Sequence, residues 1–520
     1  TRHQRRRAEP AGRRWDTWEA WWSGDPDQLR HHYGAATRGG QFFNRPAQHA
    51  GGVVGSLARM WWGRPAPANE PDTKLHCPLA GDICRASADL LFSEPLTATS
   101  THTATTTALD QLLDDGMQAK LLEAAEVQAA LGGVYLRPVA DPTISDRAWL
   151  DAVTPECAIP EWAWGRLAAV TFWKVVQADD RGHNVWRHFQ RYEPGVIIHA
   201  LYQGSDTDVG RPVPLPDVES LAPLAALVDD QGRAPTGYPR LSATYIPNML
   251  PNRRWRRHPV LAPMGRSDLD GTEPMLDALD ETVSSWMRDV RLAKGRVHVP
   301  AGMLDNLGPG KGAAWDPDRE VYSEVPGMLG GRDTALTVTQ FAIRVDEHRQ
   351  TAREWVDVAL RHAGYAGGSV GIVREGGGLK TATEITADER RSFITLDRKI
   401  GYWRPGLASN ALPALLVCDA QAFGRPLPDL DEPIHVAFAD SVSEDMLTLA
   451  STADILNRAD AASTDVKVRL VHPDWSDQQV ADEVTAIAAE RGPVLDAPFD
   501  FGDGPGESDD VRAARNLPAS

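Results

Sequence analysis

The chain has 520 residues, of which 42% are hydrophobic, and its formal net charge is −18 at pH 7. This length exceeds the roughly 100–200 residues of one domain, so we expect two to four compact units. No run of about 18 apolar residues is present, which excludes a transmembrane helix, and the arginine-rich start lacks the apolar core of a secretory signal. We therefore expect no membrane partner, and a protein that stays in a cytoplasm or in a particle assembled there.

Residues 1–29 are interpreted as a basic and aromatic arm. Six arginines fall within residues 1–14, and Trp15, Trp18 and Trp22 lie at helical spacing. This spacing predicts an apolar helix face that packs in a core or on a neighbouring element or subunit. A second arginine run, NRRWRRH at 252–258, is interpreted like the first as a solvated face or a mobile segment, because charge runs usually are.

The segment from about residue 125 to residue 202 is rich in strand-forming residues. Runs such as GGVYLRPVA and VWRHFQRYEPGVIIHALYQG predict strands, and Pro194-Gly195 predicts the turn of a hairpin. Residues 203–240 are rich in Pro, Gly and Asp, and we interpret them as an exposed insertion.

After Gly271 the apolar period becomes helical. The stretch PMLDALDETVSSWMRDVRLAKG predicts a helix of about twenty residues, roughly 30 Å long, that ends at Gly295. Its narrow apolar seam, which suits side-by-side packing of helices, consists of Leu276, Leu279, Val283, Trp286 and Val290. Asp277 and Asp280 are interpreted as its solvated face rather than as a catalytic pair.

A second helix of similar length is predicted by RVDEHRQTAREWVDVALRHAG, with Trp355 on its apolar face and Gly364 as its C-terminal stop. Between the two helices, residues 296–340 break into short strand-like pieces such as RVHVPAGML and REVYSEVPG. If the helices are antiparallel, this β-rich excursion lies at their far tip.

A glycine-rich loop and a third helix follow. Thr381 and Glu384 have the spacing of a capping box, which predicts that a helix begins there. Its apolar face runs to Trp403, with Lys399 elsewhere, and Pro405 should interrupt it. Further helices are predicted within 440–460, 463–475 and 476–491, and residues 501–520 are predicted to be disordered.

Two motifs raise the alternative of an enzyme. GGGLKT at 376–381 lacks the spacing of a phosphate-binding loop, because Leu379 separates the last glycine from Lys380. GGSVG at 367–371 matches the nucleophile elbow of serine hydrolases, but it follows a predicted helix instead of a strand. We therefore predict no catalytic residue and no enzyme.

Metal and cofactor sites are not indicated either. The four cysteines share no repeated short spacing and are interpreted as buried thiols: Cys77, Cys84, Cys157 and Cys418. His31 and His32 are adjacent and so lack the one-turn spacing of common helical metal sites. We predict no metal and no cofactor.

Several blocks resemble, in the same order and separation, the portal proteins of tailed double-stranded DNA bacteriophages of the siphophage type. They are SDLDGTEPMLDALDETVSSWMRDVRLAKGRVHVP, IRVDEHRQTAREWVDVALRHAG, GGGLKTATEITADERRSFITLDRKIGYW, KLHCPLAGDICRASADLLFSEP, LGGVYLRPV and HVAFADSVSEDMLTLASTADILNRADAAS. The resemblance covers roughly residues 30–495, whereas the insertion and the arginine-rich start match nothing in the family.

The resemblance implies an α+β portal fold. Carried over by segment, it implies a wing at 30–271, stem helices at 272–295 and 341–363, a clip at 296–340, a tunnel loop at 364–380, a long bridging helix at 381–428 and a crown at 429–500. It also implies a ring, usually of twelve subunits, at one capsid vertex of a virion. Double-stranded DNA would pass through the ring, which would contact the terminase large subunit, a head-to-tail adaptor, and the major capsid and scaffolding proteins.

The resemblance also implies roles for individual residues. The tunnel-loop candidates that would face DNA are Arg374, Glu375 and Lys380, and the stem candidates that would face the channel are Arg288, Arg291 and Lys294. The apolar seam residues and Trp355 would pack the stem, and Thr381 and Glu384 would cap the bridging helix. Two alternatives remain: a ring-forming scaffold without DNA transit, and an enzyme that hydrolyses nucleotides or esters.

Overall fold

The computed structural model describes residues 2–33, 74–179, 182–293, 343–371, 382–438, 446–459, 461–472 and 477–491, together with the short segments 296–298, 305–306, 313–314 and 337–339. The chain divides into two units, Thr1–Ala439 and Asp440–Ser520. The first combines helices with antiparallel strands, which confirms the predicted α+β class.

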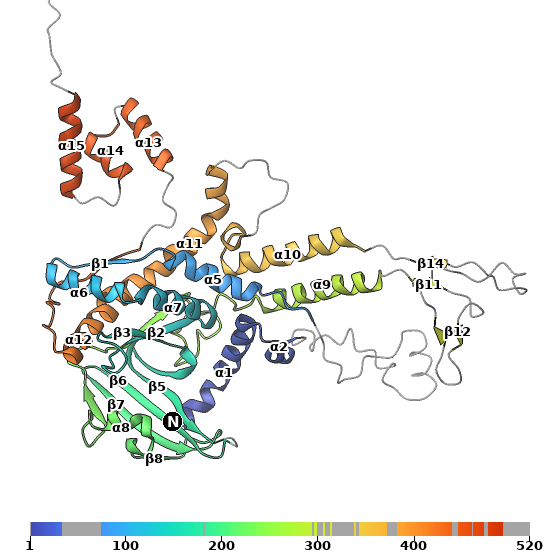
Figure 1. The fold of residues 1–520 in the computed structure, drawn as a ribbon, viewed down its shortest axis with the longest axis horizontal. Helices are drawn as coiled ribbons and strands as arrows, with labels where there is room; N and C mark the ends of the chain where they lie inside the picture. Colours follow the sequence, from blue (N-terminus) through green and yellow to red (C-terminus); the bar gives the residue numbers. More distant parts are fainter. Residues whose placement is uncertain are drawn as a thin grey trace, which may run out of the picture. The chain divides into compact units, whose positions relative to one another are not determined.

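The first unit begins with helices, shown in blue to cyan in Figure 1. They are α1 (Arg2–Ser23), α2 (Pro26–His32), α5 (Leu79–Phe92), α6 (Thr103–Asp114) and α7 (Met117–Leu131). After α7 the chain forms a three-stranded antiparallel sheet of order β10-β2-β3, from Thr244–Pro247, Gly133–Val139 and Trp149–Val153. This sheet and the helices around it enclose the main core.

A larger antiparallel sheet of order β4-β5-β6-β7-β8 follows, with β9 also paired to β7. Its strands are β4 (Ala158–Ala163), β5 (Arg166–Ala178), β6 (Val185–Glu193), β7 (Val196–Gly204), β8 (Arg211–Val213) and β9 (Arg233–Pro235). Glu193 pairs with Val196 across Pro194-Gly195, and Gly195 has φ of +80°, so the predicted hairpin turn is confirmed.

The interpretation of residues 203–240 as an exposed insertion is wrong in part. Strands β8 and β9 both pair with β7, and between them lies the short helix α8 (Ala222–Ala225). Leu215, Val218 and Leu221 are buried in a small apolar cluster with Leu201 of β7. Pro and Gly punctuate the segment, but its few apolar residues are sufficient to anchor it on the sheet.

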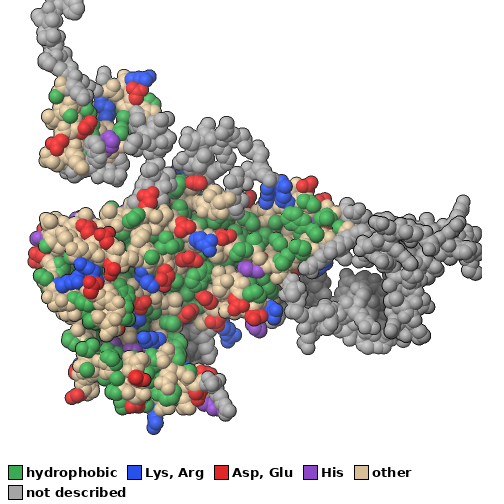
Figure 2. All heavy atoms as spheres, viewed as in Figure 1, with side chains coloured by type: hydrophobic (Ala, Val, Ile, Leu, Met, Phe, Trp, Pro, Cys, Tyr) green, Lys and Arg blue, Asp and Glu red, His purple; other side chains and the backbone are tan. Residues whose placement is uncertain are grey.

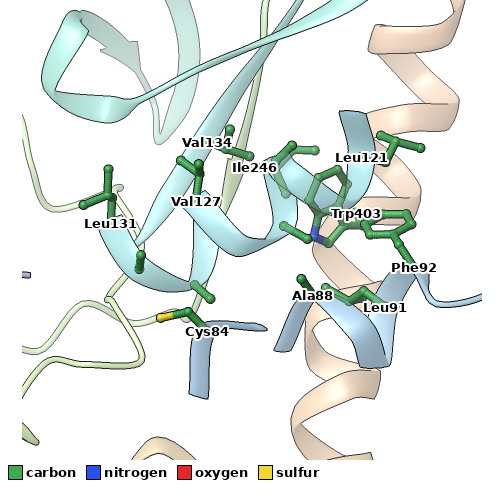
Figure 3. Packing of buried hydrophobic residues seen from close by; sticks show 14 of the residues in the cluster. Cys84, Ala88, Leu91, Phe92, Leu121, Val127, Leu131, Val134, Ile246 and Trp403 are labelled. Atoms are coloured by element: carbon green, nitrogen blue, oxygen red, sulfur yellow. The ribbon is translucent and has the colours of Figure 1, made fainter. Parts of the chain in front are cut away.

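The main core lies where α5 and α7 meet the long helix α11 (Ala382–Gly406) and the three-stranded sheet (Figure 3). Trp403 of α11 is fully buried, its ring centroid lies 4.9 Å from that of Phe92 in an edge-to-face arrangement, and its Nε1 donates to Gln128 Oε1 at 2.9 Å. Truncation of such a side chain typically costs about 3–5 kcal/mol. The apolar face predicted for the third helix therefore ends in a core residue.

Residues 1–29 do not form a separate arm. Trp15, Trp18 and Trp21 of α1 are buried in the main core, and Trp15 Nε1 donates to the carbonyl of Leu131 at 3.2 Å. Trp22 is only half-buried, and its Nε1 donates to Glu126 Oε1. The packing predicted from the tryptophan spacing is therefore confirmed for Trp15 and Trp18, whereas the interpretation of residues 1–29 as a separate arm is wrong.

The bridging helix is predicted well, but the segment after it is not. Helix α11 continues through Pro405, widens into a π-helical turn at Leu407–Ala411 and resumes as α12 (Leu412–Phe423), as expected when proline removes a backbone donor. Strand β15 (His435–Ala437) then pairs with β1 (Thr97–Thr99). Residues 429–439 therefore belong to the first unit, not to the predicted crown.

The second unit contains helices α13 (Met446–Arg458), α14 (Thr464–Val471) and α15 (Asp477–Arg491). These are the three helices predicted for this part of the chain. Ser463 caps α14 by accepting a hydrogen bond from the backbone N–H of Val466, and Val468 and Val480 are buried. The tail at 501–520 lies outside the described residues.

Candidate functional site

Helices α9 (Glu273–Leu292) and α10 (Val345–Ala363) lie side by side and antiparallel (Figure 1). Asp289, near the end of α9, contacts His348 near the start of α10, whereas Asp270, just before α9, contacts His362 at the end of α10. Gly364 ends α10 in the left-handed conformation, with φ of +99°. The two helices predicted on either side of residues 296–340 are therefore confirmed as helices, and they run antiparallel.

Burial of the apolar seam falls along α9. Leu276 and Leu279 are 1% and 2% exposed, Val283 and Trp286 are half-buried, and Val290 is 40% exposed. Trp355 of α10 is half-buried against the main core. The seam thus continues along the helix beyond the point where the described residues bury it.

The outer ends of the two helices carry more exposed apolar groups. Met287 of α9 is 39% exposed, and at the start of α10 Ile343 and Val345 are 37% and 43% exposed. Hydrophobic side chains gather on the visible face of these helices (Figure 2). With Val290, four partly exposed apolar side chains therefore lie at the outer ends of two adjacent helices, whereas an isolated one would be ordinary.

A polar clasp joins the same outer ends. Asp289 Oδ2 accepts from Arg344 Nη2 at 2.9 Å and lies 2.9 Å from His348 Nε2, while the His348 ring stacks on Trp286 at 6.1 Å between centroids. The hydrogen bond from His348, followed by that from Arg344, holds the pKa of Asp289 below its usual value. The clasp fixes the register of the pair where apolar packing is weakest.

The interpretation of Asp280 as part of a solvated face is wrong. Its side chain is 0% exposed and binds Tyr33 Oη at 2.9 Å, His76 Nδ1 at 2.9 Å and the backbone N–H of Cys77 at 2.8 Å. Burial, and then the charge of Asp280, raises the pKa of Tyr33. Asp277 is also engaged, because its Oδ1 lies 2.9 Å from Lys74 Nζ. Both carboxylates anchor α9 instead of facing water.

The start of α9 is held by further ion pairs. Arg14 of α1 contacts both Asp270 and Glu273, and Arg254 lies 2.7 Å from Asp270. Trp18 Nε1 also donates to Glu273 Oε1 at 3.0 Å. The carboxylates before and within the first turns of α9 therefore connect it to α1 and to the segment around residue 254.

A fully buried ion pair lies just before α9. Lys399 Nζ of α11 is 2.7 Å from Asp268 Oδ2, and both side chains are 1% exposed. Lys399 also donates to Ser87 Oγ of α5, and Tyr365 Oη, just after α10, donates to Asp268 Oδ2 at 2.8 Å. The helical period alone had placed Lys399 outside the apolar face. The ion pair and its two hydrogen-bond partners therefore connect α5 and α11 with the residues just before α9 and just after α10.

The residues predicted to face DNA are only partly described. Arg288 is exposed on α9, whereas the side chains of Arg291 and Glu384 are not described. Lys294, Arg374, Glu375, Lys380 and Thr381 lie outside the described residues, so their roles remain predictions. Between the paired helices, the described segments form two short antiparallel ladders: β11 (Arg296–His298) with β14 (Thr337–Thr339), and β12 (Asp305–Asn306) with β13 (Ala313–Ala314). REVYSEVPG lies outside them.

The serine of the GGSVG motif lies in a helical connection. Residues Gly368–Val370 form a 3₁₀ turn after α10, and Ser369 Oγ donates to Ser392 Oγ of α11 at 2.7 Å. Ser392 Oγ also accepts from the backbone N–H of Ala366 at 2.9 Å. A nucleophile elbow requires a strand before the serine and a base beside it. The Ser369 hydroxyl instead links the 3₁₀ turn after α10 to α11 through its hydrogen bond with Ser392.

The described part of the chain contains neither a metal-binding cluster nor a membrane-spanning helix. Within these residues no group of three or more His, Cys, Asp or Glu side chains is arranged to hold a metal ion. Among the same residues, no helix has the length and apolar character needed to cross a membrane.

Comparisons with known proteins give only distant similarity, and only among solved structures. No family model matches the chain, and no curated protein matches it. Among solved structures, the chain is similar to a chain of the "Neck of native GTA particle computed with C12 symmetry", with 15% identity and a TM-score of 0.39. The similarity covers 80% of this chain and 92% of the other. It is too distant to support an argument about function.

Proposed function

We propose that the chain is the subunit of a portal ring at one vertex of a phage capsid. The observation that carries the proposal is the apolar seam of α9 and α10, which is buried at its inner end and open at its outer end. Because six sequence blocks resemble portal proteins, we interpret the open seam as a contact surface between copies of the chain. In a ring, the missing cover is the same helix pair of the neighbouring copy.

A two-helix layer explains why the seam stays open in one copy. Each helix covers one side of its partner, so apolar groups on the flanks require a further neighbour. Met287 and Val290 on α9, with Ile343 and Val345 on α10, are the groups that remain exposed. A heterologous contact between copies, repeated by rotation, closes into a ring.

The proposal includes a ring of twelve copies through which double-stranded DNA enters and leaves. Twelve copies at −18 carry a net charge of about −216, which would oppose tight adhesion of DNA to the channel as a whole. Arg288, Arg291, Lys294 and the tunnel-loop residues would then act as local contacts. This role places the protein in the virion.

The partners follow from the same proposal. The strands between α9 and α10 would contact the terminase large subunit during packaging and a head-to-tail adaptor afterwards. The outer part of the first unit would face the major capsid and scaffolding proteins. The ring itself would need neither a catalytic residue nor a cofactor, since the motor would hydrolyse the nucleotide.

Native mass measurement and electron microscopy of the purified chain test the proposal. A closed ring with a central channel of roughly 20 Å or more, wide enough for duplex DNA, is the expected result. A ring with a narrower channel would favour the scaffold without DNA transit. A monomer that hydrolyses nucleotides or esters would overturn the proposal.

A further inference from the structure

The turn at residues 252–258, Asn-Arg-Arg-Trp-Arg-Arg-His, is pinned to the first unit by three of its side chains. Asn252 is 2% exposed, donates to the carbonyl of Gly265 at 2.8 Å and accepts from the backbone N–H of Trp255. Trp255 is 7% exposed, and its ring lies 5.8 Å from that of Trp15 and 5.8 Å from that of Trp18. His258 Nδ1 accepts the backbone N–H groups of Val260 and Leu261. We call residues 252–258 the arginine turn.

The anchors recur every third residue, so the arginines between them point outward. Arg254 pairs with Asp270, but Arg253, Arg256 and Arg257 are exposed. Across the described residues, no carboxylate lies in ion-pair range of these three guanidinium groups. Like charges held close together on a fixed backbone repel one another. Because the backbone of the arginine turn is already ordered, binding of a partner carries no entropy cost for ordering it.

Apolar groups flank the three arginines. Leu250 is 40% exposed, and Pro251 and Pro259 are exposed on either side of the turn. The phosphate backbone of a nucleic acid would leave these apolar groups exposed to water, whereas a protein segment can bury them. The aromatic ring of the turn faces inward, so it offers no platform on which bases could stack.

We propose that the arginine turn is a docking site for an acidic segment of a partner protein, one that presents carboxylates to Arg253, Arg256 and Arg257 and apolar side chains to Leu250 and the adjacent prolines. Arginine is well suited to this role because its planar fork binds a carboxylate through two hydrogen bonds. The site requires only the first unit, so it can bind whether or not the chain forms a ring.

The test is a titration of the full chain with three labelled probes, followed by fluorescence anisotropy. The first is a helical peptide with Glu on one face and Leu on the other. The second replaces each Leu with Gln at the same net charge, and the third is a DNA duplex of matched charge. We expect the Glu–Leu peptide to bind most tightly, and its affinity to fall as salt is raised.

Variants assign the binding to the turn. The triple variant Arg253→Gln/Arg256→Gln/Arg257→Gln should weaken binding of the Glu–Leu peptide by about tenfold or more. Leu250→Ser should weaken the Glu–Leu peptide but not the Glu–Gln peptide. The matched control, Arg211→Gln/Arg233→Gln/Arg240→Gln, removes the same charge from other exposed positions and should bind like wild type. All variants should unfold like wild type, because the altered side chains lie at the surface.

Three results would overturn the proposal. The DNA duplex could bind more tightly than either peptide, which would assign the turn to nucleic acid. The control triple variant could lose as much affinity as the arginine-turn variant, which would reduce the effect to net charge. The wild-type chain could also fail to bind the Glu–Leu peptide at all.

Discussion

Lys399 and Asp268 form an ion pair, 2.7 Å from Nζ to Oδ2, in which both side chains are 1% exposed although they lie 131 positions apart in the sequence. Asp268→Asn would leave the ammonium group buried without its carboxylate. We expect the free energy of unfolding, measured in urea, to fall by about 3–5 kcal/mol. Lys120→Met in the exposed pair with Glu123 is the control, and it should cost about 0–1 kcal/mol. Equal effects of the two substitutions would contradict a role for burial.

Buried His188 of β6 and half-buried His199 of β7 should make stability depend on pH. His188 Nε2 lies 3.1 Å from His199 Nδ1; burial, and then the His199 charge, lowers the pKa of His188 to about 3, while burial, and then Arg137, lowers that of His199 to about 4. The unfolded chain protonates both near pH 6.5, so stability is lost as pH falls below that value. Each histidine should contribute a loss of roughly 2 kcal/mol between pH 7 and pH 5.

Urea unfolding of His188→Gln/His199→Gln at several pH values checks the assignment. The slope of stability against pH between 7 and 5 should be shallower in this variant than in wild type. His183→Gln, which changes an exposed histidine before β6, serves as the control and should keep the wild-type slope. An unchanged slope in the double variant would show that other groups cause the acid sensitivity.

The clasp at Asp289 predicts a local effect of pH that arises from a carboxylate instead of a histidine. Its pKa is lowered by His348 and then by Arg344, so its contribution is present above the unfolded value of about 3.9 and is lost as pH falls through the lower folded value. The protection of amide hydrogens in the outer turns of α9 and α10, taken relative to the intrinsic exchange rate at each pH, should therefore fall below about pH 4. Asp289→Asn should show fast exchange already at pH 6, whereas Asp346→Asn should not.

The two paired helices could be predicted from sequence because their information is local. A seam at three-and-four spacing defines α9, and Gly364 defines the end of α10 by a conformation that glycine adopts readily. The narrowness of the seam was visible too. The decrease in burial from the inner to the outer end of α9 could not be predicted, because it depends on which segments pack against the inner end.

Buried charges could not be predicted in the same way. Asp280 and Lys399 occupy helical positions that look solvated, but their partners Tyr33 and Ser87 lie 247 and 312 positions away. Nothing local distinguishes such a carboxylate from a surface one. The same reason explains α1, whose arginines suggested a free arm while its tryptophans contact residues more than 100 positions away.

The open seam predicts a variant that folds but does not assemble. Met287 and Val290 are 39% and 40% exposed, so Met287→Ser/Val290→Ser should weaken the single chain only through the part of each side chain that it already covers, and the variant should still fold. If a neighbouring copy covers these side chains, the loss should be roughly 2 kcal/mol for each interface, or about thirtyfold in its dissociation constant. Native mass spectra over a range of protein concentrations measure this. Ile144→Ser/Leu227→Ser alters two side chains that are each 73% exposed elsewhere and should assemble like wild type. Assembly that survives Met287→Ser/Val290→Ser, or that fails equally in the control, would place the interface between copies away from the outer ends of α9 and α10.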